Sequence, residues 1–203
     1  AAAGYGEDKA IFGYGTTGSK SSLTNLVSNS GVVAADVTGV GTQRYSLAAA
    51  SYGTDKAIFG YGTSGINDDI SLTNLVANTG VVSADVTGVG SARRDLTAAS
   101  YGTDKAIFGY GSNATTNLSM TNLVSNSGVV ASDVTGVGSA RFSLAAAGYG
   151  GDKAIFGYGY IQASTSHVSM TNLVSNSGVV ASDVTGVGTA RNGLAAAGYS
   201  TSA

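Results

Sequence analysis

The chain contains no cysteine, no proline and no tryptophan, and it has a single histidine, His167. The lack of cysteine excludes a disulfide framework, a thiolate metal site and a cysteine nucleophile. One histidine excludes a multi-histidine metal site within the chain, and a hydrolytic triad would have to use His167, which we expect to be a solvated loop residue. We therefore expect a protein that is not an enzyme and that holds no metal and no cofactor.

Charged side chains are also scarce. They make up 11% of the 203 residues, against about a quarter in typical domains. The net charge of −2 gives no basic surface for nucleic acid, and no apolar run reaches the roughly 18 residues of a membrane-spanning helix. The first five residues, Ala1–Tyr5, lack a methionine and a signal-peptide pattern, which favours a processed or trimmed end. We expect neither a nucleic-acid partner nor a membrane span.

A fourfold internal repeat organises the rest of the sequence. An Asp-Lys-Ala-Ile-Phe-Gly-Tyr-Gly block begins at Asp8, Asp55, Asp104 and Asp152. A Leu/Met-Thr-Asn-Leu-Val block begins at Leu23, Leu72, Met120 and Met170. An Asp-Val-Thr-Gly-Val-Gly block begins at Asp36, Asp85, Asp133 and Asp183. An arginine follows each of these last blocks, at Arg44, Arg93, Arg141 and Arg191. Such repetition is the signature of a repeat architecture.

Length differences between the repeats fall in one place. The segments between Gly-Tyr-Gly and Leu/Met-Thr-Asn are residues 16–22, 63–71, 112–119 and 160–169. These four variable segments share almost no sequence. A constant frame with one free segment in each unit is how a scaffold presents variable loops.

Inside a repeat, the patterns are typical of short β-strands separated by glycine turns. In the first repeat, residues 9–14 are apolar and aromatic, residues 23–27 alternate, and residues 32–37 are β-branched. Residues 47–52 are rich in alanine, which favours a helix, but they are too few for an independent one, so we predict a strand. Turns such as residues 53–55, Gly-Thr-Asp, suit tight hairpins. Each unit should then contain four antiparallel strands. We expect these core residues and their equivalents: Ile11, Phe12, Leu26, Val33, Val37 and Leu47.

The order of these features resembles the kelch repeat. In the last full unit, Arg141 precedes a small-apolar strand (144–147), a tight turn (150–152), a strand ending in glycine (155–159) and a third strand (171–174). This sequence departs from the kelch pattern where a tyrosine splits the glycine pair and where a valine replaces the aromatic residue of the fourth strand.

The resemblance implies an all-β protein that forms one repeat domain over residues 1–203. It would be a β-propeller of four kelch-like four-stranded antiparallel blades, at residues 1–43, 44–92, 93–140 and 141–190, with 191–203 as a surplus first strand. A β-solenoid with two coils in each repeat is the alternative, which the hairpin turns disfavour.

In composition the chain is also similar to kelch-like repeats of bacteriophage virion proteins, which are rich in Gly, Ala, Ser, Thr and Asn. That similarity implies an extracellular or virion location and a structural or adhesive role, in a phage tail or capsid appendage. The partners would be other virion or surface proteins, or a cell-surface glycan. The alternative function is a lectin-like, carbohydrate-binding propeller with one weak site in each blade, where four sites would gain avidity.

Antiparallel strands should bring the variable segments and the connections into each first strand to one face of the protein. The candidate binding residues of this loop face are Lys20, Tyr45, Asp68, Asp69, Arg94, Asn113, Phe142, Tyr160, Ile161 and His167. The arginines that recur in every unit should be structural, pairing with aspartates or carbonyls between blades: Arg44, Arg93, Arg141 and Arg191. The aspartates of the first turn should be turn residues: Asp8, Asp55, Asp104 and Asp152. The Gly-Tyr-Gly tyrosines suit either packing between blades or a platform for a sugar or protein.

The two ends of the sequence repeat each other. Residues 1–5 and 195–199 are both Ala-Ala-Ala-Gly-Tyr, so the chain carries five first strands for four copies of the others. An unpaired strand or an open sheet edge favours association. We therefore expect self-association or a continuation of the repeat array at the ends.

Overall fold

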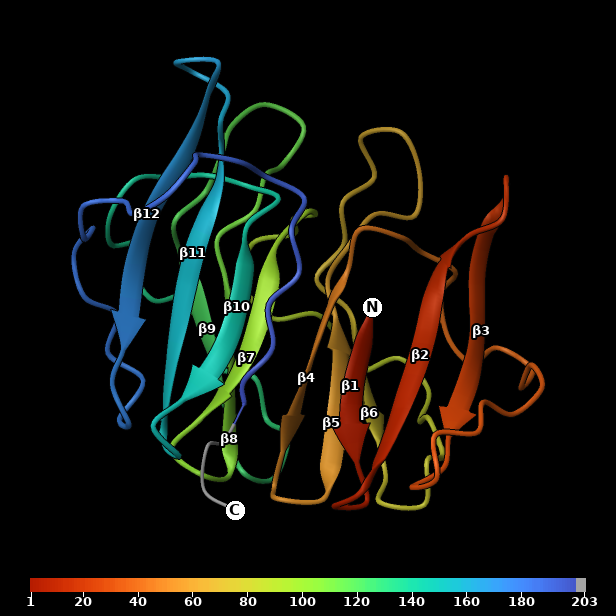
Figure 1. The fold of residues 1–203 in the computed structure, drawn as a ribbon. Helices are drawn as coiled ribbons and strands as arrows, with labels where there is room; N and C mark the ends of the chain where they lie inside the picture. The colour runs from red at the N-terminus through yellow and green to blue at the C-terminus, as the bar shows by residue number, and fades with distance from the viewer. Residues whose placement is uncertain (200–203) are drawn as a thin grey trace.

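The computed structural model describes residues 1–199, and the last four residues of the predicted surplus strand lie outside this range. These residues form four antiparallel sheets of three strands each and no helix (Figure 1). The first sheet contains β1 (Ala2–Tyr5), β2 (Lys9–Thr16) and β3 (Lys20–Val27). The second contains β4 (Ala48–Tyr52), β5 (Lys56–Gly60) and β6 (Thr73–Val76). The third contains β7 (Thr97–Tyr101), β8 (Lys105–Gly109) and β9 (Thr121–Val124). The fourth contains β10 (Ala145–Tyr149), β11 (Lys153–Ile161) and β12 (Ser166–Val174).

Each repeat folds its first two strands into a tight hairpin. In the second repeat, β4 pairs with β5 from Ala48 opposite Gly60 to Tyr52 opposite Lys56. Gly53 and Thr54 between them both have positive φ, 59° and 69°. Positive φ at these two residues lets the chain reverse within the three residues between the paired strands. The alanine-rich segment is therefore a strand, as predicted, because its partner strand holds it extended.

The fourth strand of each unit differs from the prediction. Residues 32–37 make only two isolated bridges to β3, Val27 with Val33 and Thr24 with Val37. Val27 follows Thr24 by three positions, whereas Val37 follows Val33 by four. The outer segment therefore carries one extra residue, which interrupts the ladder. Where the ladder is interrupted, the Asn25 side-chain amide donates to the Ala34 carbonyl at 3.2 Å and to Asp36 Oδ1 at 2.9 Å. Each sheet thus has three regular strands rather than four.

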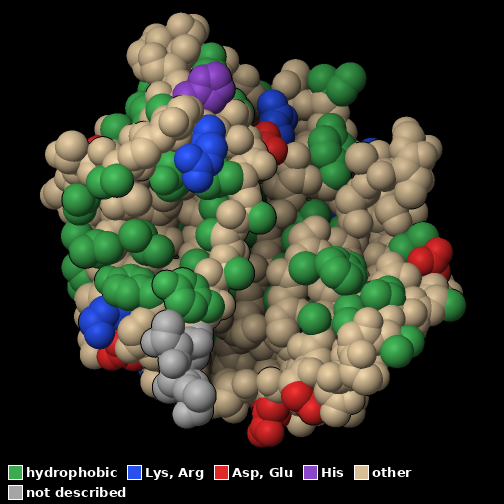
Figure 2. Space-filling model, in the orientation of Figure 1, with side chains coloured by type: hydrophobic (Ala, Val, Ile, Leu, Met, Phe, Trp, Pro, Cys, Tyr) green, Lys and Arg blue, Asp and Glu red, His purple; other side chains and the backbone are tan. Residues whose placement is uncertain are grey.

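The four first strands lie at the centre of the molecule. β1 contacts β4, β4 contacts β7 and β7 contacts β10, and the remaining strands of each sheet extend outward (Figure 1). A cavity of about 330 Å³ between the first strands is lined mainly by alanine and leucine, with Leu194–Ala196 on its wall. Figure 2 shows the surface hollowed along the middle of this view. Small side chains at these positions let four strands approach one another.

The core lies between neighbouring sheets. The Phe59 ring of the second sheet packs edge to face against Tyr14 of the first, with ring centroids 5.2 Å apart. A Cβ atom on Gly13 would lie 2.7 Å from the Phe59 ring, so that position must be glycine. The same contact joins Phe108 to Gly60 and Tyr61, and Phe156 to Gly109 and Tyr110. One packing unit is therefore used three times.

Three predicted core residues are exposed. Phe12 is 50% exposed, whereas its equivalent Phe59 is fully buried, because Phe59 packs on the sheet beside it and none of the described sheets packs on Phe12. Val33 and Val37 are also exposed, because the irregular segment that carries them lies beyond β3 at the outer edge of the sheet. Ile11 and Leu47 are buried as predicted.

Truncating Phe59 to Ala should lower the free energy of unfolding by about 3–5 kcal/mol, because it leaves a cavity between two sheets. The matched substitution Phe12→Ala removes the same ring from a half-exposed position and should cost less than about 1 kcal/mol. Urea unfolding followed by circular dichroism measures both. Equal losses for the two variants would contradict the assignment of Phe59 to the core.

Candidate functional site

The repeated arginines are buried between sheets. Arg93 is fully buried, opens the third unit and lies between the second and third sheets. Its Nε donates to the Tyr110 carbonyl at 2.9 Å, and its Nη2 donates to Asn122 Oδ1 at 2.7 Å. Its guanidinium carbon also lies 4.2 Å from the ring centre of Tyr61 in the second sheet. One side chain thus joins two sheets by hydrogen bonds and a cation–π contact.

Arg44 and Arg141 repeat this arrangement at the other two junctions. Each donates to a tyrosine carbonyl and an asparagine of the sheet that follows it in the chain, and lies over a tyrosine of the preceding sheet. Arg191 is exposed, lies 4.3 Å from the centre of the Tyr158 ring and donates to the Thr189 carbonyl. Among the described residues, Arg191 therefore makes the contact with the preceding sheet only.

At each boundary between neighbouring sheets, an aspartate of the later unit also accepts hydrogen bonds from a serine or threonine just before the arginine. Asp133 of the third sheet accepts hydrogen bonds from the Ser91 amide at 2.9 Å and the Ser91 hydroxyl at 2.7 Å. It also accepts from the Asn122 amide at 2.9 Å. Burial alone would raise the pKa of Asp133, but the hydrogen bonds from Ser91 and Asn122 outweigh it and hold the pKa below its usual value. The carboxylate stays ionised at neutral pH, 3.9 Å from Arg93.

The aspartates of the first turns lie at the opposite end of the sheets. Asp55 accepts from the Lys56 ammonium at 2.7 Å and from the Asn78 amide at 2.9 Å, and these bonds lower its pKa. Its backbone carbonyl accepts from the Gly6 amide of the preceding turn at 2.6 Å. Asp104 and Asp152 accept the equivalent backbone bonds from Gly53 and Gly102. Asp8, in the first turn, accepts from Asn29 at 3.0 Å.

Replacing Arg93 by Ala should destabilise the protein by more than about 3 kcal/mol, because it leaves the buried Asn122 side chain and the Tyr110 carbonyl without their donor and Asp133 without its neighbouring cation. Arg191→Ala removes the same side chain from an exposed position and should change stability by less than about 1 kcal/mol. Thermal unfolding followed by calorimetry compares the two variants. A small loss for Arg93→Ala would mean that the arginine does not hold the sheets together.

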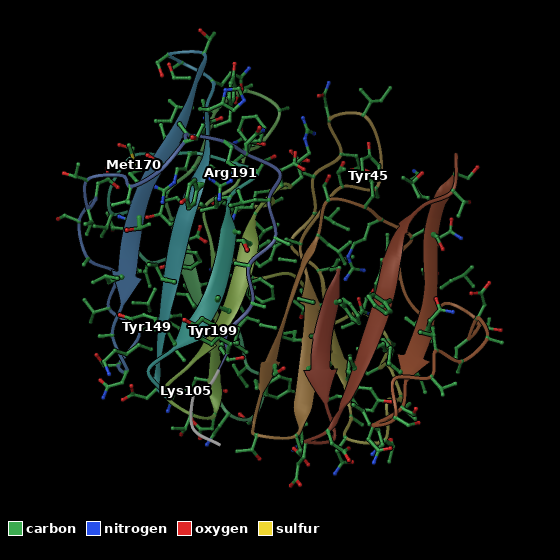
Figure 3. The ribbon with its side chains drawn as sticks, viewed as in Figure 1. Tyr45, Lys105, Tyr149, Met170, Arg191 and Tyr199 are labelled. Carbon is green, nitrogen blue, oxygen red and sulfur yellow. The ribbon has the colours of Figure 1, made fainter. Side chains whose placement is uncertain are left out.

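The four variable segments lie at one end of the sheets, away from the first turns (Figure 1). Figure 3 labels Tyr45 and Arg191 toward this end, and Tyr149, Lys105 and Tyr199 toward the other. In the fourth repeat, β11 and β12 continue into the segment, with Tyr160 opposite His167 and Ile161 opposite Ser166. The first repeat also extends its hairpin, with Thr16 opposite Lys20.

Several predicted binding residues use their charge within the protein. Arg94 Nη1 lies 3.0 Å from Asp69 Oδ1, and the Asp69 side chain is only 7% exposed. The Lys20 ammonium donates to the Ser64 carbonyl of the neighbouring segment. Asp68 accepts from the Ser64 hydroxyl. Arg94, Asp69 and Lys20 connect neighbouring loops and Asp68 closes a turn within one, so these four charges are engaged within the protein.

Aromatic residues gather on the loop face of the fourth repeat. Tyr160 packs edge to face against Phe142 at 5.5 Å and against His167 at 5.1 Å. Backbone bonds between Phe142 and Tyr160 fix their spacing. Tyr45 occupies the position equivalent to Phe142 in the second repeat and bonds to Thr63 in the same way. The structure therefore brings together Phe142, Tyr160 and His167, with Ile161 next in the strand.

A groove of about 510 Å³ lies beside this aromatic group. Its walls come from the variable segments of the third and fourth repeats and from the connection at Ser139 and Ala140. Asn117 contributes an Oδ1 atom that is buried and has no hydrogen-bond partner among the described residues. Asn113, the predicted residue, instead uses its own Oδ1 to accept from the Thr115 and Thr116 amides.

Asn117 was missed by the sequence reasoning because both asparagines fall in one polar segment. No sequence signal separates the residue that shapes the turn from the one that lines the groove. Two smaller crevices, each of about 190 Å³, are lined mainly by valine and threonine. One lies between the first and second sheets, and the other lies between the second and third. They lack the aromatic and amide groups of the larger groove.

Comparison with known proteins does not assign the chain to a family. A scan of the chain against protein-family models finds no match, and a search among curated proteins finds no similar sequence. Within residues 1–199 no helix is long and apolar enough to cross a membrane. The same residues bring no three His, Asp or Glu side chains together as metal ligands would lie.

Proposed function

We propose that the protein is a non-enzymatic structural and adhesive module whose constant sheets present variable loops on one face for binding. The observation that carries this proposal is that the variable segments and the constant turns lie at opposite ends of the sheets. The four segments that differ in length and sequence lie at one end of the sheets, while the first turns at the other end repeat the same contacts. Selection for binding would act on the first end, and the fold constrains the second.

The proposed architecture is an open β-propeller with kelch-like blades. Its support is the radial arrangement of four sheets whose first strands face one cavity, together with the kelch-like order of sequence features. Each blade would have three regular strands and an irregular outer edge. The resemblance to bacteriophage virion repeats favours an extracellular particle, a tail or capsid appendage, as the place where this module works. Its partners there would be other virion or surface proteins.

A second candidate function is carbohydrate binding, and the groove favours it. Threonine hydroxyls and the Gln162 amide line the groove and offer hydrogen bonds to sugar hydroxyls, and the Tyr160 ring lies nearby. The four variable segments differ too much to form four equivalent sites. We therefore place the sugar site in this groove rather than once in every blade.

Replacing residues 160–169 by residues 16–22 tests the loop face directly. Both segments continue a hairpin of the same frame, so the melting temperature should change little. Binding to whole bacterial cells or to a glycan array should be lost, because the groove and the aromatic group are removed. Unchanged binding by this variant would contradict the proposal.

The reverse control changes a first turn. Gly102→Val places a Cβ atom 2.8 Å from the Asn176 carbonyl at a φ of 58°, so it should lower the melting temperature and leave the folded protein able to bind. For the sugar site alone, Gln162→Met keeps the length of a side chain that lines the groove and removes its amide. If binding on the glycan array survives Gln162→Met, the groove is not the sugar site.

A further inference from the structure

The two ends of the array expose opposite halves of the junction that joins the sheets. We define the leading face as the outer surface of the first sheet, with Phe12, Asn25, Gly31, Val33 and Asp36. We define the trailing face as the outer surface of the fourth sheet, with Tyr149, Gly157, Tyr158, Leu173 and Arg191. Every residue of each face has equivalents that contact the neighbouring sheet at the three internal junctions.

The internal junctions show what each face is shaped to contact. Phe59 packs on Gly13 and Tyr14. A Cβ atom on Gly80 would lie about 3 Å from the Tyr5 hydroxyl and Leu26, so this second turn packs closely on the preceding sheet. Asp85 accepts from the Thr42 amide and hydroxyl at 3.0 and 2.7 Å. Each leading face thus supplies a phenylalanine, a glycine turn and an aspartate.

At the ends of the array these contacts are absent among the described residues. A Cβ atom on Gly31 would meet nothing within 4 Å, and one on Gly157 would meet only the Thr171 methyl group. Tyr149 is 41% exposed and Leu173 is 40% exposed, whereas Tyr52 and Tyr101, the equivalents of Tyr149, are each 3% exposed. The trailing face has an unfilled position for a phenylalanine, and the leading face offers one.

We propose that the leading face of one molecule docks on the trailing face of a second copy of this chain. Phe12 would pack on Gly157 and Tyr158, as Phe59 packs on Gly13 and Tyr14. Asp36 would accept hydrogen bonds from Thr189, and Arg191 would reach Asn25 of the second copy. Both halves belong to one sequence, so a second copy matches them residue by residue. This contact is head to tail, and each added copy leaves one face of each kind free.

The C-terminal segment determines how the first strands fit in this assembly. The Gly193 amide donates to the Ser143 carbonyl at 2.8 Å, which repeats the bond from Ser143 to Asp95. A Cβ on Gly198 would lie 2.7 Å from the Gly148 carbonyl, so residues 195–199 lie beside β10. That is the place of a following sheet's first strand. Because residues 195–199 and 1–5 are identical, the segment can pair with β2 of the next copy in place of that copy's β1.

Sedimentation velocity over a range of protein concentrations tests the docking. The wild-type chain should form oligomers as the concentration rises. Phe12→Asp and Leu173→Asp each place a charge on one exposed end face, so both variants should stay monomeric and keep the wild-type melting temperature. Ile66→Asp is the matched control, because Ile66 is 93% exposed on a loop away from both faces. This control should assemble like the wild type.

Mixing the two blocked variants provides the sharper result. Phe12→Asp keeps an intact trailing face and Leu173→Asp an intact leading face, so an equimolar mixture should form a 1:1 dimer and nothing larger. A wild-type chain that stays monomeric at every concentration, or a mixture that forms no dimer, would overturn the proposal. The loop replacement of residues 160–169 should leave assembly intact, which separates this inference from the proposed binding function.

Strand replacement has its own test. In the first hairpin, Ala3 lies opposite Ile11, and Ala197 would take this position in the assembly. Ala197→Pro removes the amide that would donate to β2, so it should weaken association at least about tenfold, and the monomer should melt as the wild type does. Wild-type association by Ala197→Pro would show that β1 keeps its place, and would overturn the strand replacement.

Discussion

A buried arginine shared between two sheets is the interaction on which the rest of the structure depends. The Arg93 guanidinium replaces its water shell with a tyrosine ring of one sheet and an asparagine and a carbonyl of the next. Burial lowers its pKa, but the group remains cationic, so it needs every one of these partners. Two further contacts surround it. A phenylalanine ring packs on a glycine, as Phe108 does on Gly60, and an aspartate accepts from a serine or threonine, as Asp133 does from Ser91. Neighbouring sheets therefore fit in one orientation.

This shared contact explains why the blocks of the sequence recur while the segments between them do not. An arginine, a Gly-Tyr-Gly and a Thr-Asn-Leu-Val from each unit meet at every junction, so a change in any of them would break a packed interface. The variable segments touch the junction only at its rim. They tolerate length changes because an extended hairpin or a loop can leave the same pair of strands.

The repeat, the strands and the position of the variable segments could be predicted from the sequence, since glycine turns and short apolar runs are local signals. The irregular fourth segment could not, because the Asn25 amide competes with the backbone for the Ala34 carbonyl and no pattern of hydrophobicity records that competition. The exposure of Phe12 depends on which sheet lies beside it, which a repeated motif does not reveal. Likewise, Asp69 and Arg94 are far apart in sequence, and only the fold pairs them.

Hydrogen exchange of the dilute monomer, followed by mass spectrometry, tests most directly the account that junctions hold an open array together. The second and third sheets have a junction on each side, whereas the first and fourth have one. Amides of β5 and β8 should therefore exchange more slowly than those of β2, with the C-terminal segment fastest. Equal protection of all four sheets would show that the array closes on itself in solution, and it would contradict this account.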